Sequence, residues 1–272
     1  MKILVTGAGG FIGSHLVERL LRAGHQVRAL VRYHSRGDWG HLEELPDEVC
    51  DALDVRSGDV TDGPQVRELV DGCDAVCHLA ALIGIPYSYR APASYVSVNV
   101  VGTLNVLEAC RASGVGRLLV TSTSEVYGTA RYAPIDEAHP LQGQSPYSAS
   151  KIAADKLAES FYNSFDLPVV TVRPFNTYGP RQSARAVIPT VLTQALSGAR
   201  QIRLGNLEPK RDLTFVHDTT RAFQLALETP GIEGETIHFG SGRAGDEGDI
   251  GIGQRVGADA CQVFAAHLLF RG

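Results

Sequence analysis

A tyrosine and a lysine, Tyr147 and Lys151, stand four positions apart in a stretch with a helical pattern. Residues at i and i+4 share one face of a helix, so the phenol and the ammonium can converge on one site. Ser145 and Pro146, just before them, are typical of a helix N-cap and first turn. Because a neighbouring ammonium stabilises a phenolate, we expect a lowered pKa at Tyr147, which could then act as a general base near neutral pH.

A second polar segment, residues 121–128, reads Thr-Ser-Thr-Ser-Glu-Val-Tyr-Gly and follows a predicted strand. Ligands of doubly wound sheets bind at the carboxyl ends of the strands. A hydroxyl there can hold a substrate oxygen, and a carboxylate can remove a proton from carbon. The alternative is an ordinary polar loop with Glu125 at the surface. Our candidate catalytic residues are Thr123, Ser124, Glu125, Tyr147 and Lys151.

Three glycines, Gly7, Gly10 and Gly13, lie between the first predicted strand and the first predicted helix. Glycine lets the backbone approach a pyrophosphate, and the helix N-terminus offers free N–H groups. The position between strand and helix makes the motif specific, and it predicts a bound dinucleotide. The residues that we expect to contact this cofactor are Gly7, Gly10, Phe11, Ile12, Gly13, Arg32, Arg36, Asp59, Val60, Leu79, Ala80, Ala81, Thr121, Tyr147 and Lys151.

The end of the second predicted strand carries Arg32, with Arg36 nearby, where NAD-binding chains usually have an acid. A guanidinium suits a 2′-phosphate by charge and geometry, so NADP is favoured over NAD. The alternative is that both arginines are solvated loop charges. Asp59 and Val60 follow a short run and are placed to contact adenine. His78 is either a packed, hydrogen-bonded histidine or a ligand.

The elements that must position these residues alternate between strand and helix. Short runs rich in Val, Ile and Leu at 3–5, 27–31, 75–79, 118–121 and 169–172 are typical of parallel strands buried on both faces. The alternation predicts an α/β fold with a Rossmann-type doubly wound parallel sheet. The predicted helices cover 11–23, 64–71, 99–113, 147–165 and 185–197.

The pattern changes after residue 173, where prolines interrupt it. We predict a Rossmann domain with the catalytic residues over 1–173, a smaller, apparently truncated substrate lobe interleaved with the sheet over 174–242, and an atypical tail over 243–272. Within the tail we expect loop or disorder over 243–256. For the segment 257–269 the pattern favours neither a helix nor an irregular structure over the other.

Composition excludes several classes of protein. The chain has 44% hydrophobic and 20% charged residues and a net charge of −5, a globular balance that argues against nucleic-acid binding. The five cysteines have no paired spacing, so neither a disulfide framework nor a metal site is predicted. The N-terminus starts with a strand pattern, and no apolar run is long enough to span a membrane. We expect a cytoplasmic protein without a membrane partner.

Together, the three motifs resemble the extended short-chain dehydrogenase/reductases, specifically the NAD(P)-dependent nucleotide-sugar epimerases and dehydratases. The Thr-Ser-Glu of 123–125 looks like that of GDP-mannose 4,6-dehydratases. The strings at 81–89, 140–147 and 173–185 are closest to N-acetylglucosamine 4,6-dehydratases of legionaminic acid pathways. The resemblance covers residue 1 to about 242 and fades after Gly242, whereas related chains continue into a fuller substrate lobe.

The resemblance implies a nucleotide-diphosphate sugar as substrate and a closed redox cycle as mechanism. Tyr147 would take the proton of the sugar 4-hydroxyl, Thr123 would hold O4, and Glu125 would remove the C5 proton before the 6-hydroxyl leaves as water. Ser124 is a poor acid, so Glu125 or a relaying water would protonate the leaving group. Helices over 99–113 and 147–165 could form the four-helix interface of a homodimer. The substrate-binding candidates are Ser88, Asn176, Arg185 and Arg211.

Other reactions use the same machinery. A UDP-glucuronate decarboxylase can carry the same Thr-Ser-Glu turn, and a nucleotide-sugar 4-epimerase needs no carbon base at Glu125. The alternative of a different class is a non-catalytic NAD(P)-binding protein, motivated by the short C-terminus.

Overall fold

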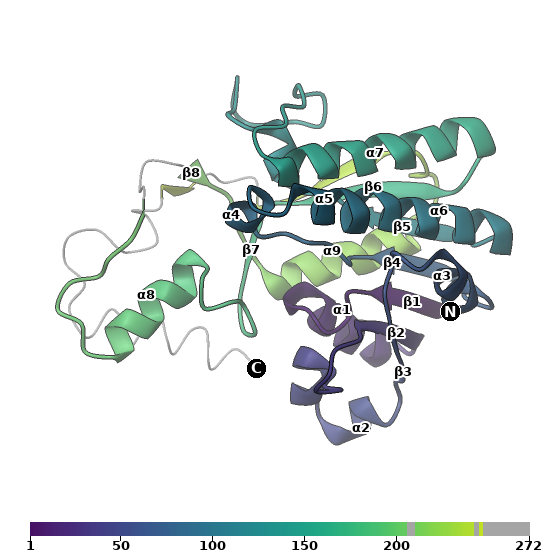
Figure 1. Ribbon diagram of the computed structural model, residues 1–272, viewed down its shortest axis with the longest axis horizontal. Coiled ribbons are helices and arrows are strands. Elements are labelled where there is room, and N and C mark those ends of the chain that lie inside the picture. The colour runs from purple at the N-terminus through teal and green to yellow at the C-terminus, as the bar shows by residue number, and fades with distance from the viewer. Residues whose placement is uncertain (206–209, 242–244, 247–272) are drawn as a thin grey trace.

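The computed structural model describes residues 1–205, 210–241 and 245–246, and its centre is one parallel sheet (Figure 1). Seven strands pair in the order β10-β6-β5-β4-β1-β2-β3, and every pairing is parallel. The predicted doubly wound Rossmann-type sheet is therefore confirmed. The strands are β1 (Lys2–Thr6), β2 (Gln26–Arg32), β3 (Asp54–Gly58), β4 (Ala75–His78), β5 (Arg117–Thr121), β6 (Val169–Pro174) and β10 (Thr236–Phe239).

Helices cover both faces of this sheet. Two pack on one face, α1 (Phe11–Arg22) and α9 (Val216–Glu228), and three pack on the other, α3 (Gly63–Val70), α6 (Gly102–Ser113) and α7 (Pro146–Phe165). Successive strand residues point to opposite faces, so both must be apolar. Ile3 and Val5 accordingly belong to the core with α1, whereas Leu4 lies between them in the core with α6.

The smaller lobe lies beyond the carboxyl ends of the strands, at the left of Figure 1. It contains α8 (Val187–Leu196) and two short sheets: β7 (Asn176–Tyr178) is parallel to β9 (Leu213–Phe215), and β8 (Lys210–Arg211) is antiparallel to β11 (Gly245–Asp246). The remaining short elements are η1 (Gly40–Glu44), α2 (Asp47–Cys50), α4 (Ile85–Ser88), α5 (Pro92–Tyr95), the π-helical turn η2 (Val96–Val101) and η3 (Ser124–Tyr127).

The structure differs from the sequence-based expectations at several elements. Strands β3 and β10 and helix α9 were not among the predicted elements. The helix predicted from residue 99 starts as the π-helical turn η2 and becomes α-helical at Gly102. Most of the predicted tail, including the alternatives for 257–269, lies outside the described residues. Residues 245–246, which we expected in a loop, form β11.

The described part of the chain has no helix long and apolar enough to cross a membrane. It also has no cluster of His, Cys, Asp and Glu side chains suited to a metal. The four described cysteines are free thiols, and three of them are buried.

Candidate active site

The glycine motif forms the tight turn between β1 and α1. Gly7 has a φ of 69°, and a Cβ there would lie 2.8 Å from the backbone nitrogen of Ala80. A Cβ on Gly13 would overlap the carbonyl oxygen of Gly7. Gly10 is the N-cap of α1 and makes no side-chain cap hydrogen bond to the amide groups of the first turn. A cradle of this kind fits a pyrophosphate, whose charge the helix N-terminus stabilises.

The residues predicted to contact the adenosine end lie at the carboxyl ends of β2 and β3. Arg32 ends β2, its side chain is 74% exposed, and its Nε lies 4.0 Å from the Asp59 carboxylate. Asp59 also accepts hydrogen bonds from the backbone and hydroxyl of Thr61. Val60 is buried, and Arg36 is exposed on the loop after β2. The structure thus brings Arg32 and Asp59 together.

The segment after β4 passes the glycine turn. Its amides at Leu79 and Ala80 both donate to the Thr6 hydroxyl, at 3.1 Å, which fixes the backbone that runs into Ala81. His78 is fully buried, and its two ring nitrogens contact the hydroxyls of Thr6 at 2.8 Å and Thr103 at 3.1 Å. Burial lowers the pKa of His78 to about 3. Of the two alternatives for His78, the structure therefore supports the packed, hydrogen-bonded one.

Helix α7 starts as predicted. Ser145 is its N-cap and exchanges hydrogen bonds with Ser148 in a capping box, and Pro146 occupies the first turn. Tyr147 and Lys151 are 6% and 4% exposed and belong to the buried face of the helix. The Tyr147 ring packs edge to face with Tyr95 of α5, with centroids 6.2 Å apart.

The electrostatics of this pair differ from the expectation. Burial raises the pKa of Tyr147 to about 12, and the negative charge of Glu125 adds to the rise, while a hydrogen bond with Thr123 opposes it. The Lys151 Nζ donates to the Thr121 carbonyl at 2.5 Å. Burial lowers the pKa of Lys151 to about 8, and Asp155 opposes this. The predicted lowering of the Tyr147 pKa is therefore wrong for the chain by itself, because burial raises this pKa.

The Thr-Ser-Glu segment forms a single turn directly after β5. Thr123 caps η3 by accepting a hydrogen bond from the Glu125 amide at 3.2 Å. Thr123, Ser124 and Glu125 are all half-buried. The Thr123 hydroxyl lies within hydrogen-bonding reach of the Tyr147 phenol, and Glu125 is near enough for its charge to raise the pKa of Tyr147. The catalytic role of these three side chains stays a prediction.

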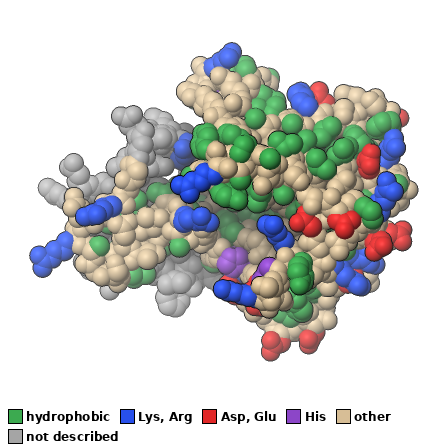
Figure 2. Space-filling model, viewed as in Figure 1, with side chains coloured by type: hydrophobic (Ala, Val, Ile, Leu, Met, Phe, Trp, Pro, Cys, Tyr) green, Lys and Arg blue, Asp and Glu red, His purple; other side chains and the backbone are tan. Residues whose placement is uncertain are grey.

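The four predicted substrate-binding residues lie in different environments. Asn176 is half-buried in β7, and its backbone N–H donates to the Asp212 backbone carbonyl at 3.1 Å. Arg185 is exposed before α8, and Arg211 is half-buried in β8. Ser88 differs from the expectation, because it is fully buried and its hydroxyl donates to the Ile85 carbonyl at 2.7 Å. The structure does not present Ser88 to a ligand. Figure 2 shows a hollow between the smaller lobe and the sheet, with Lys and Arg side chains around it.

The sequence analysis missed one residue that connects the elements of the site. Asn99 stands in the π-helical turn η2 and is 1% exposed. Its side chain bonds both backbone groups of Leu82, at 2.8 and 2.9 Å, and the Ser150 hydroxyl at 2.9 Å. It thereby fastens the segment after β4 to the turn of α7 that lies between Tyr147 and Lys151. An asparagine among the valines of residues 96–101 was the available signal.

Comparison with protein families finds a match to the family model described as GDP-mannose 4,6 dehydratase over residues 4–244. Among curated proteins, a dTDP-glucose 4,6-dehydratase of Streptomyces antibioticus is 36% identical over 246 residues, covering 89% of this chain and 72% of that protein. The UDP-glucose 4-epimerase of Mycolicibacterium smegmatis is also 36% identical, over 248 residues, covering 89% and 78%.

Solved structures are similar over nearly the same range. A double mutant of the dTDP-glucose 4,6-dehydratase of Streptomyces venezuelae, with NAD bound, superposes with a TM-score of 0.81 at 31% identity and covers 92% of this chain and 79% of that one. A variant of the UDP-glucuronic acid 4-epimerase of Bacillus cereus, in complex with NAD and a fluorinated UDP-glucuronic acid, has a TM-score of 0.84 at 31% identity and covers 92% and 81%.

Proposed function

This chain belongs to the GDP-mannose 4,6-dehydratase family of NAD-dependent nucleotide-sugar dehydratases and epimerases, and from that membership we propose that it is a nucleotide-sugar 4,6-dehydratase. The observation that carries the proposal is the turn after β5, where Thr123 and Glu125 lie beside the Tyr147 phenol. Dehydration needs a base for a carbon-bound proton next to the base for the hydroxyl, and a carboxylate beside a phenol supplies both.

The cofactor would lie across the carboxyl ends of β1, β2 and β4. Gly7, Gly10 and Gly13 supply a turn without Cβ atoms for the pyrophosphate. The Thr121 hydroxyl at the end of β5 is buried and has no hydrogen-bond partner within the described part of the chain. When bound, the nicotinamide supplies reversible hydride transfer, accepting hydride from C4 and returning it at C6. We propose NADP as the preferred form, because the exposed Arg32 guanidinium suits a 2′-phosphate. The similar solved structures hold NAD, so the affinities of this chain for NADP and for NAD are to be measured side by side.

The chain's own residues would then act in sequence. Tyr147 accepts the proton of the 4-hydroxyl while Thr123 holds O4. A 4-ketone acidifies the C5 hydrogen, and Glu125 removes it as the 6-hydroxyl departs with a proton as water. Ser124 is a poor acid for that departure, which leaves Glu125 itself or a relaying water to deliver the proton. Return of hydride to C6, with a proton from solvent added at C5, would give a 4-keto-6-deoxy sugar and leave the cofactor in its starting oxidation state.

The substrate class follows from the lobe beyond the strands. We propose that Arg185 and Arg211 bind the diphosphate of a nucleotide sugar, because planar guanidinium groups match phosphate oxygens, and that Asn176 binds the sugar side. The division into a cofactor domain over 1–173, a substrate lobe over 174–242 and a tail stays a prediction, as does the cytoplasmic location.

We also propose a homodimer through α6 and α7. Apolar side chains are exposed along this layer of helices, where Figure 2 shows hydrophobic residues gathered. They include Val96 at 53%, Val101 at 42% and Phe165 at 47% exposure. Apolar side chains that gather on one face of the molecule are typical of a buried interface.

The experiment that tests the dehydratase proposal is Glu125→Gln. It removes the carboxylate and retains the shape of the turn, so C4 oxidation should persist as cofactor reduction while formation of 4-keto-6-deoxy sugar stops. Glu108→Gln, an exposed glutamate on α6, is the matched control. Unchanged product formation by Glu125→Gln would exclude Glu125 as the base.

A 4-epimerase is the second candidate, because epimerases are among the similar proteins. It predicts an epimer from unmodified enzyme and little effect of Glu125→Gln. A decarboxylase predicts a pentose and carbon dioxide, and a non-catalytic protein predicts cofactor binding with no turnover.

A further inference from the structure

A buried acid follows the lysine of the site by one turn of α7. Lys151 and Asp155 lie on the same buried face of the helix and are 4% and 5% exposed. Adjacent residues at the end of β5 hold both side chains. The Thr121 carbonyl accepts from Lys151 Nζ at 2.5 Å, and the Ser122 hydroxyl donates to Asp155 Oδ2 at 2.8 Å. The ammonium and the carboxylate are therefore fixed relative to each other by one strand end.

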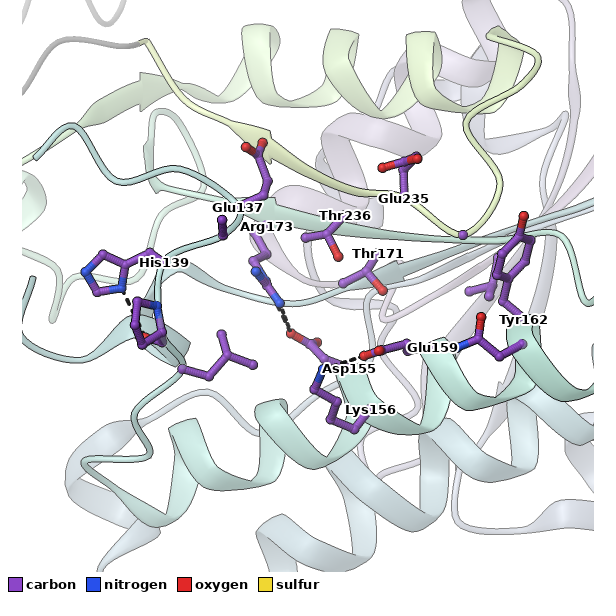
Figure 3. Close-up of a pocket in the computed structure, with 16 residues that line it drawn as sticks. Glu137, His139, Asp155, Lys156, Glu159, Tyr162, Thr171, Arg173, Glu235 and Thr236 are labelled. Carbon is purple, nitrogen blue, oxygen red and sulfur yellow. Dashed lines mark hydrogen bonds and ion pairs between the residues drawn. The ribbon is translucent and has the colours of Figure 1, made fainter. Parts of the chain in front are cut away.

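The carboxyl group of Asp155 pairs with a buried arginine. Arg173 of β6 donates to the same Oδ2 from Nη2 at 3.0 Å and from Nε at 3.3 Å, and Figure 3 shows this contact between the strand and the helix. The pKa of Asp155 lies above its ordinary value, because burial raises it and Arg173, Ser122 and Lys151 offset the rise only in part. A guanidinium keeps its proton at any physiological pH, so the buried contact with Arg173 favours the ionised carboxyl.

The other oxygen of this carboxylate, Oδ1, is buried and has no hydrogen-bond partner among the described residues. Its charge is thus not fully compensated by Arg173 and Ser122. In a low-dielectric interior such a charge acts strongly on the nearest mobile proton. Lys151 is one helical turn away and has burial working against its own charge.

The groups around the pair carry little competing negative charge. His78 is neutral because burial lowers its pKa. The Tyr127 phenol contacts Arg173 Nη1 at 2.6 Å and His238 Nε2 at 2.5 Å, and Glu137 faces His238 rather than Lys151. The titratable and charged groups that face the pair or its immediate partners are Tyr147, His78, Glu125, Tyr127, Arg173, His238 and Glu137.

We propose that Asp155 is a positioning residue whose charge keeps the buried Lys151 in its ammonium form at physiological pH. The inference rests on the proposed function, in which Tyr147 accepts a proton and a positive charge held nearby would favour its phenolate. The pair of Tyr147 and Lys151 found in the sequence does not include this acid, although Asp155 follows Lys151 by the same four residues.

The test follows the proton on Lys151 directly. The chain has only four lysines, Lys2, Lys151, Lys156 and Lys210. Selective ¹³C labelling of lysine therefore gives a simple NMR spectrum of the full chain, and Lys151→Met assigns the signal of interest. We expect Lys151 to titrate near pH 8 in the unmodified chain, and about one pH unit or more lower in Asp155→Asn.

Two variants separate charge from structure. Asp155→Glu keeps the carboxylate and should keep the titration close to that of the unmodified chain. Tyr127→Phe breaks the hydrogen bonds on the far side of Arg173 but leaves the carboxylate, so it should leave the Lys151 titration unchanged. If Asp155→Asn does not fold with Arg173 unpaired, the double variant Asp155→Asn/Arg173→Gln removes both charges together. Loss of the guanidinium favours the ammonium, so the lowering should be smaller than in Asp155→Asn but in the same direction, because Asp155 is the charge that acts on Lys151.

An unshifted Lys151 titration in folded Asp155→Asn, or in the double variant, would overturn the proposal, and so would an equal shift in Tyr127→Phe. The alkaline limb of the kcat/KM profile should move to lower pH in parallel with the NMR shift. Because the NMR titration needs no substrate, it decides the role of Asp155 even if no nucleotide sugar is turned over, and the two proposals fail separately.

Discussion

Lys151→Met should make the protein more stable and less active at the same time. The shift of the Lys151 pKa from 10.5 to about 8 corresponds to roughly 3 kcal/mol against the buried charge in the folded state at neutral pH. Methionine has a similar length and no charge. The change also removes the hydrogen bond to the Thr121 carbonyl, which costs roughly 1–2 kcal/mol. We expect the free energy of unfolding to rise by about 1–2 kcal/mol at pH 7.

The sign of this difference depends on pH. Below pH 8 the lysine is protonated in both folded and unfolded chains, so the penalty is complete. Between about pH 8 and 10.5 the folded chain has lost this proton and the unfolded chain still binds it, so the stability of the lysine form rises with pH. The advantage of methionine should therefore shrink over this range and disappear near pH 10.

Urea unfolding followed by circular dichroism at pH 7 and pH 10 measures both effects. Lys156→Met is the matched control, because Lys156 is an exposed lysine on the same helix, paired with Glu159. Its effect should stay below about 1 kcal/mol at both pH values. A Lys151→Met protein that is less stable than the parent at pH 7, or whose difference is the same at both pH values, would refute the reasoning.

Three further predictions concern the cofactor and the phenol. Gly13→Ala places a Cβ against the Gly7 carbonyl and should weaken NAD(P) binding roughly tenfold or more. Gly205→Ala, where a Cβ meets no neighbouring atom, should leave binding unchanged. Fluorescence titration measures both dissociation constants, and equal values would contradict binding of the pyrophosphate at the glycine turn. Arg32→Glu should lower affinity for NADP about tenfold or more relative to NAD; an unchanged ratio in the same titration would remove Arg32 from the 2′-phosphate site. Tyr147→Phe keeps the packing on Tyr95 but should slow C4 oxidation roughly 10²- to 10⁴-fold in stopped-flow measurements of cofactor reduction, and retained oxidation would exclude the phenol as base.

The sequence predicted the elements whose burial is uniform. Strands β1, β2, β4, β5 and β6 are apolar on both faces, and the parallel sheet follows from that pattern. Strand β3 was missed because it lies at the sheet edge, where Arg56 and Ser57 are exposed. Strand β10 was missed because Thr236 and His238 interrupt its apolar pattern at the opposite edge.

The site was predictable where spacing alone sets the geometry. The i, i+4 relation of Tyr147 and Lys151 and the turn of Thr123–Glu125 follow from local structure. The pKa of Tyr147 did not follow, because it depends on desolvation by residues distant in the sequence, such as Tyr95. The contact of Asp155 with Arg173 likewise joins a helix to a strand that only the fold brings together.

The central claim is that the chain removes water from a nucleotide hexose. Mass spectrometry of the product pool, after incubation with candidate nucleotide sugars and NADP or NAD, tests it most directly. We expect a product lighter than its substrate by one water, with a 4-keto group and a 6-methyl group and no net consumption of cofactor. A product pool that contains only an epimer of unchanged mass, or a pentose with carbon dioxide, would contradict it.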